Sequence, residues 1–134
     1  MSEADILDQL FNLYDRYWVI VQWWASVSFG IIMIAHFASN KLTGLLLSTL
    51  IVLYTVYSLW LYLGLSYNLG IMEGFFDELR LLDESGELSQ GGRNALQNPL
   101  SGASTLLGMI TLPTTFCTCV GYLIYAYIRG RKSA

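Results

Sequence analysis

The chain has 134 residues, the size of a single domain. Hydrophobic residues make up 54% of it and charged residues only 13%, roughly half the charged share of an ordinary soluble domain. This composition excludes disordered, collagen-like and nucleic-acid-binding chains, and it disfavours a soluble globular enzyme.

Charged residues are missing from three long stretches of the chain. Residues 17–40, 42–72 and 94–128 contain no Asp, Glu, Lys or Arg. A helix needs about 20 apolar residues to cross the hydrocarbon core of a bilayer, so each stretch has room for one crossing. The expected fold is therefore an all-α integral membrane protein with transmembrane helices at 18–38, 43–66 and 104–128.

The charged residues are distributed unequally between the two sides of this arrangement. One side has four basic residues and no Asp or Glu, namely Lys41, Arg129, Arg131 and Lys132. The other side has all ten acidic residues, with only Arg16, Arg80 and Arg93 to balance them. Because Lys and Arg near helix ends favour the cytoplasm, we expect a bacterial inner (plasma) membrane protein with its N-terminus outside. The basic tail at 129–134 is then cytoplasmic.

The N-terminal segment, 1–17, has apolar residues at helical spacing that continue into the first crossing. They are Ile6, Leu7, Leu10, Phe11, Tyr14, Tyr17 and Trp18, with acidic residues beside them. The spacing predicts an amphipathic helix on the non-cytoplasmic side, either as an interfacial anchor or as a docking helix for a partner.

The segment at 67–103 repeats this pattern after the second crossing. Its apolar stripe contains Ile71, Met72, Phe75, Phe76, Leu79 and Leu82. We expect a second amphipathic helix there, lying on the membrane or extending the second crossing, followed by a loop over 83–98. Its polar face is acidic, which favours contact with another protein surface over anionic lipid. The expected partner-facing residues are Phe75, Phe76, Asp77, Glu78, Asp83 and Glu84.

Small and polar residues inside the crossings indicate how helices pack. Pairs four residues apart let helix backbones approach closely, and they occur once in each crossing, at Ser26 with Gly30, Gly44 with Ser48, and Ser104 with Gly108. Thr55 continues a polar seam from Ser48 along the second crossing. Such faces pack helices within one chain or between chains. Pro113 removes one backbone hydrogen bond and is expected to kink the third crossing.

No residue pattern indicates catalysis or a cofactor. His36 has only Met33 near it on one helical face, which is far short of a metal-ligand set. Cys117 and Cys119 lie on opposite sides of a helix and are expected to be apolar fillers. The crossings contain no acidic or basic side chain, which disfavours a pump or an ion-coupled transporter. We therefore expect a non-enzymatic protein without a metal or cofactor.

These features favour a small accessory or structural subunit of a membrane complex, or a homo-oligomer. Its partners would be membrane lipids and other membrane-protein subunits or further copies of itself, and not nucleic acid. The alternative is an oligomeric pore, because the layout resembles three-span phage holins in topology, although in no sequence motif. Its wettable face would contain Ser48, Thr55, Ser58 and Tyr62, or Thr111, Thr115 and Thr118. A small sensor or channel modulator acting through the outer loop is a third possibility.

Overall fold

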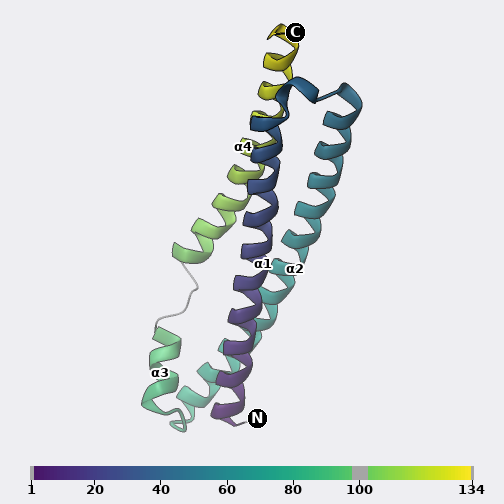
Figure 1. Cartoon of the computed structure of the whole chain (residues 1–134). Helices are drawn as coiled ribbons and strands as arrows, with labels where there is room; N and C mark the ends of the chain where they lie inside the picture. Colours follow the sequence, from purple (N-terminus) through teal and green to yellow (C-terminus); the bar gives the residue numbers. More distant parts are fainter. Residues whose placement is uncertain (1, 98–102, 134) are drawn as a thin grey trace.

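A computed structural model describes residues 2–97 and 103–133, and these form helices and short connections without any strand. The elements are α1 (Glu3–Phe37), the 3-10 turn η1 (Ser39–Lys41), α2 (Gly44–Glu84), α3 (Gln90–Gln97) and α4 (Ala103–Ser133). Figure 1 shows α1 and α2 as an antiparallel hairpin. Helix α4 runs beside the C-terminal half of α1, and α3 lies near the other end of the hairpin.

Helix α1 runs without a break through the segments expected at 1–17 and 18–38. It begins with a capping box, in which Ser2 Oγ accepts a hydrogen bond from the Asp5 amide at 3.3 Å. The Asp5 carboxylate accepts one in return from the Ser2 amide at 3.1 Å. The Ser2 hydroxyl also donates to the Asp5 carboxylate at 2.6 Å, and this bond, followed by the one from the Ser2 amide, lowers the pKa of Asp5.

Helix α2 is also continuous, from the Thr43 N-cap to Glu84. The segment at 67–84 therefore extends the second crossing, which is one of the two arrangements that the sequence allows. The helix ends before Gly86, whose positive φ of 77° suits a residue without a side chain. The loop expected over 83–98 is wrong for Gln90–Gln97, because these residues form α3.

Three helices are long and apolar enough to cross a membrane, in Glu3–Phe37, Gly44–Glu84 and Ile110–Lys132. The all-helical architecture with three such helices is thus confirmed. At 1.5 Å per residue α1 is about 52 Å long and α2 about 61 Å long. Both lengths exceed the roughly 30 Å of a hydrocarbon core, so each hairpin helix is much longer than one crossing requires.

The buried apolar residues form two separate cores. The first, here the head core, joins the N-terminal part of α1 to the C-terminal part of α2, and contains Ile6, Leu10, Leu13, Met72, Phe76, Leu79 and Leu88. The second, here the bundle core, joins α1, α2 and α4, and contains Ile31, Ala35, Leu42, Tyr54, Cys119, Leu123 and Ala126. The two cores lie near opposite ends of the hairpin.

Polar groups in and beside the bundle core bond from helix to helix. Ser28 Oγ and Tyr54 Oη lie 2.8 Å apart, and Trp24 Nε1 donates to Ser58 Oγ at 3.2 Å. Cys119 is buried and its thiol contacts the Ser28 carbonyl oxygen at 3.7 Å. The interior polar groups of α1 therefore have partners on both neighbouring helices.

Pro113 lies inside α4, which continues as a helix on both sides of it. The carbonyl that Pro113 cannot bond is four residues earlier, on Met109. The hydroxyl of Thr114 donates to the carbonyl of Ile110, the residue that follows Met109, at 2.7 Å. The kink expected at Pro113 stays a prediction.

Candidate interaction surface

One end of the molecule is a small helical body, here the acidic head, made of residues 3–17, 67–84 and the segment to Gln97. It is organised around the head core, in which Leu79 and Ile6 are almost fully buried. Leu88 closes this core from the connection between α2 and α3, and Leu96 of α3 packs against it. The head thus has its own apolar interior beyond the apolar windows of the long helices.

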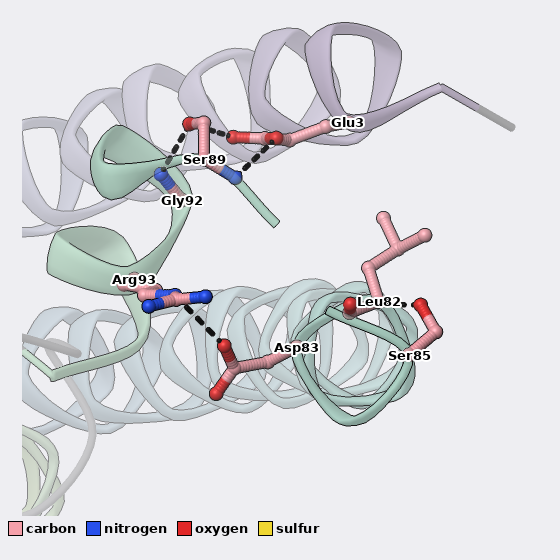
Figure 2. A network of polar contacts seen from close by, with 7 residues as sticks. All are labelled: Glu3, Leu82, Asp83, Ser85, Ser89, Gly92 and Arg93. Carbon is pink, nitrogen blue, oxygen red and sulfur yellow. Dashed lines mark hydrogen bonds and ion pairs between the residues drawn. The ribbon is translucent and has the colours of Figure 1, made fainter. Parts of the chain in front are cut away.

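Polar contacts fix α3 to the start of α1, as Figure 2 shows. The Glu3 carboxylate accepts one hydrogen bond from the Ser89 amide at 2.9 Å and one from the Ser89 hydroxyl. Ser89 Oγ also accepts a bond from the Gly92 amide at 3.2 Å, so Ser89 caps α3. The bonds from Ser89, its hydroxyl first, lower the pKa of Glu3.

A second contact fixes α3 to α2. Arg93 Nε lies 3.1 Å from Asp83 Oδ1, as Figure 2 also shows, and the two side chains are about equally exposed. An exposed pair of this kind contributes little free energy by itself. Together with the Glu3–Ser89 contact, however, it places α3 across the ends of both long helices.

Gly92 lies where these contacts crowd together. A Cβ atom at this position would lie 2.6 Å from Glu3 Oε1 and 2.8 Å from Leu88 Cγ. No side chain fits there without a shift of its neighbours, so the Glu3 contact requires a glycine at this position.

The surface of the head is strongly acidic. Its exposed carboxylates come from both long helices and the connection to α3, and are Asp5, Asp8, Asp15, Glu73, Asp77, Glu78, Asp83, Glu84 and Glu87. Two of its three arginines are already paired, Arg80 with Asp77 and Arg93 with Asp83. A surface with this excess of one charge attracts a positively charged partner over a range of about one Debye length, roughly 8 Å at physiological salt.

The residues expected to face a partner divide into two groups. Asp77, Glu78, Asp83 and Glu84 are exposed on the head. Phe76 is only 9% exposed inside the head core, and Phe75 is half-buried against it. Phe76 therefore packs inside the head against α1, whereas Phe75 remains partly exposed beside it, and the assignment of these residues to a partner surface stays a prediction.

Two exposed apolar side chains that lie among the carboxylates of the head are not among the predicted partner-facing residues. Phe11 is 66% exposed, and Asp8, Asn12 and Asp15 follow the same helical face. Leu81 is 65% exposed between Asp77 and Glu84. Exposed aromatic residues are enriched among the energetically dominant residues of interfaces, which makes Phe11 the stronger candidate. The sequence places Phe11 in the apolar stripe of α1, which suggests burial, but the buried face of the helix contains Leu13 and leaves Phe11 exposed.

The small residues of the helices have different surroundings. Ser26 is exposed, and a Cβ at Gly30 would have no described atom within 4 Å. Ser48 is exposed, whereas a Cβ at Gly44 would lie 3.4 Å from Tyr127 Oη and one at Gly108 would lie 3.1 Å from Tyr17 Oη. Close approach inside the chain therefore occurs at Gly108. The side chain of Ser104 lies outside the described residues.

The hydroxyls of the polar seam mostly bond to their own helix. Thr55 is half-buried and donates to the Ile51 carbonyl at 2.7 Å, and Ser48 donates to the Leu45 carbonyl at 2.9 Å. Ser58 differs, because it accepts the bond from Trp24. The seam is thus partly used inside the chain.

A shallow apolar groove runs between α1, α2 and α4 beside that seam. It encloses about 250 Å³ of empty space, part of it open to the outside. Its lining residues are Ile20, Val21, Trp24, Ser58, Leu61, Tyr62, Leu65 and Leu112. The lining residues of the groove offer few polar atoms and include no acidic or basic side chain.

Comparisons with known proteins add no relative. No protein-family model, no curated protein and no solved structure matches the chain.

Proposed function

We propose that this protein is a non-enzymatic accessory subunit of a bacterial inner-membrane complex. Its three apolar helices cross the bilayer, and its acidic head projects from the outer face onto a basic surface of another subunit. The single observation that carries this proposal is the head itself. A body with its own core, ten acidic residues and three arginines is positioned by two continuous helices beyond their apolar windows.

The charge of the head supports a protein partner. Amphipathic helices that rest on anionic lipid place Lys and Arg on their polar face, whereas this surface is acidic. Phe11 and Leu81 give it two exposed apolar contacts flanked by carboxylates. A central apolar residue with charged residues around it is the usual composition of a protein interface.

Co-purification from the native membrane tests the proposal. Glu78 and Glu84 are exposed, and changing both to Lys (E78K/E84K) reverses charge on the head surface. The change leaves the Arg80–Asp77 and Arg93–Asp83 ion pairs in place. We expect loss of the co-purified partner, a smaller loss with E78Q/E84Q, and dissociation of the wild-type complex at high salt. Retention of the partner by E78K/E84K would exclude this surface.

A matched pair of phenylalanines tests the apolar contact. Phe11 on the head and Phe37 at the opposite end of α1 are both strongly exposed. We expect F11A to weaken partner binding by more than about fivefold, as truncation of a central aromatic residue does, and F37A to leave it unchanged. Equal effects of the two changes would show that exposed aromatics act only through lipid.

The second candidate is the homo-oligomeric pore, which one observation favours. Thr111, Thr114 and Thr118 are exposed along one side of α4. The hydroxyls of Thr114 and Thr118 donate to backbone carbonyls, so this face is only weakly polar. Dye release from vesicles holding the purified chain tests it. A pore requires release by the wild type that T118L abolishes and S58A does not.

A further inference from the structure

The end of the molecule opposite the head has a basic surface made of Lys41, Arg129, Arg131 and Lys132, here the basic end. All four side chains are exposed. Lys41 belongs to η1 and the other three to the last turns of α4. Two parts of the chain that are far apart in sequence thus contribute charge to one end of the bundle, as Figure 1 shows for η1 and α4.

Close packing holds these cations together. A Cβ at Gly130 would overlap the carbonyl group of Ser39, so the last turns of α4 lie directly against η1. Arg131 Nη1 donates to Tyr127 Oη at 3.2 Å, and its guanidinium lies over the Tyr127 ring at 5.6 Å from the centroid. A Cβ at Gly44, at the start of α2, would lie 3.4 Å from Tyr127 Oη. The packing of α4 against η1 therefore brings the backbone positions of these cations together, and Tyr127 positions the Arg131 side chain.

No carboxylate of the described residues forms an ion pair with Lys41, Arg131 or Lys132. The two ion pairs among the described residues are both on the head. The nearest acidic residue on α1 is Asp15, which about 33 Å of helix separates from Phe37. That separation is several Debye lengths at physiological salt, so the head does not screen the basic end. Arg131 contacts the ring and the hydroxyl of Tyr127, and neither group carries a negative charge that would offset the guanidinium.

The basic end directly adjoins exposed apolar side chains of α1 and α4. Phe37 is strongly exposed at the end of α1, and Tyr125 and Ile128 are exposed on α4 just before Arg129. When these residues lie in the outer part of a hydrocarbon core, the four cations lie at the depth of the phosphate groups. Juxtamembrane Lys and Arg residues at this depth attract anionic lipid, each by roughly a fivefold gain in affinity.

We propose that the basic end is a binding surface for anionic phospholipid headgroups, and that it retains such lipids in preference to zwitterionic ones. The proposal does not depend on the partner of the head. It requires only that the helices cross a bilayer.

Native mass spectrometry of the full chain in nanodiscs of equal phosphatidylglycerol and phosphatidylcholine tests this surface. We expect retained lipids to be enriched in phosphatidylglycerol. R131Q/K132Q is expected to reduce that enrichment by roughly 25-fold, at about fivefold for each cation. K41Q removes one cation from the other element and is expected to reduce it by about fivefold.

R80Q/R93Q is the matched control, because it removes the same charge from the head, where both arginines are paired with carboxylates. We expect this variant to keep the wild-type enrichment. The proposal is overturned if the wild type shows no preference for phosphatidylglycerol, or if R80Q/R93Q loses the preference as fully as R131Q/K132Q. It is also overturned if high salt leaves the preference unchanged.

Discussion

Glu3 and Ser89 are 86 positions apart in sequence, yet the carboxylate of Glu3 accepts the Ser89 amide hydrogen at 2.9 Å and the Ser89 hydroxyl as well. The start of α1 and the start of α3 are therefore held together by one polar joint. Because Ser89 also caps α3, loss of this joint affects the helix and its attachment together.

The joint makes α3 sensitive to acid. Ser89 lowers the pKa of Glu3 from its ordinary value of 4.5, so the folded head favours the ionised carboxylate. The stabilisation is complete above pH 4.5 and is lost as the pH falls through the lower folded-state pKa. We expect the protection of α3 amides from hydrogen exchange, corrected for intrinsic exchange rates, to decrease as the pH falls through the folded-state pKa of Glu3. E3Q should show low protection throughout, and E87Q on the same connection should match the wild type. A wild-type pH profile in E3Q would contradict the role of the joint.

The crowding at Gly92 predicts a difference between adjacent glycines. G92A forces a Cβ to within 2.6 Å of Glu3 Oε1 and against Leu88, so it should destabilise the head by about 1–3 kcal/mol. At Gly91 a Cβ would lie 3.4 Å from Ser89 Oγ, an ordinary contact. G91A should therefore be neutral or stabilise α3 by about 0.5–1 kcal/mol, because alanine favours helix. Hydrogen exchange of α3 distinguishes the two, and equal effects would show that the crowding is relieved at no cost.

The contact between α4 and η1 predicts a second pair of unequal glycines. A Cβ at Gly130 meets the Ser39 carbonyl, whereas one at Gly121 meets no described atom within 4 Å. G130A should lower the thermal midpoint in detergent by the equivalent of about 1–3 kcal/mol, and G121A should not lower it. The same midpoint for both variants would mean that α4 can slide along η1.

The bond between Ser28 and Tyr54 predicts a modest coupling energy. Their hydroxyl oxygens lie 2.8 Å apart between α1 and α2, beside the bundle core. Interhelical hydrogen bonds in membranes contribute about 0.6 kcal/mol on average and up to about 1.7 kcal/mol. A double-mutant cycle of S28A and Y54F, measured by unfolding in mixed micelles, should give a coupling in that range. A coupling near zero would show that both hydroxyls find other partners when separated.

Much of the architecture follows from where charge is missing. Each of the three uncharged stretches overlaps one of the helices that are long and apolar enough to cross a bilayer. The sequence predicts these helices because length and hydropathy alone decide that property. The pattern also indicated helices at both ends of the hairpin. It left open whether they continue the long helices, since a stripe of apolar residues is the same in either arrangement.

The contacts of the head were harder to predict. Apolar residues of the first segment span a wide arc, and the position of α2 decides that Leu13 is buried and Phe11 exposed. Helix α3 was hidden because Gly91, Gly92 and Asn94 favour a turn. It forms through Glu3, Asp83 and the head core, which are distant in sequence. A local pattern does not contain such contacts.

The two long helices pass from the head into the bundle without an interruption. Neither α1 nor α2 therefore has a break between the acidic head and the bundle core. A partner that tilts the head by some angle would rotate α1 and α2 by the same angle as rigid rods. Displacement at the acidic head would reappear, reversed in direction, at the basic end.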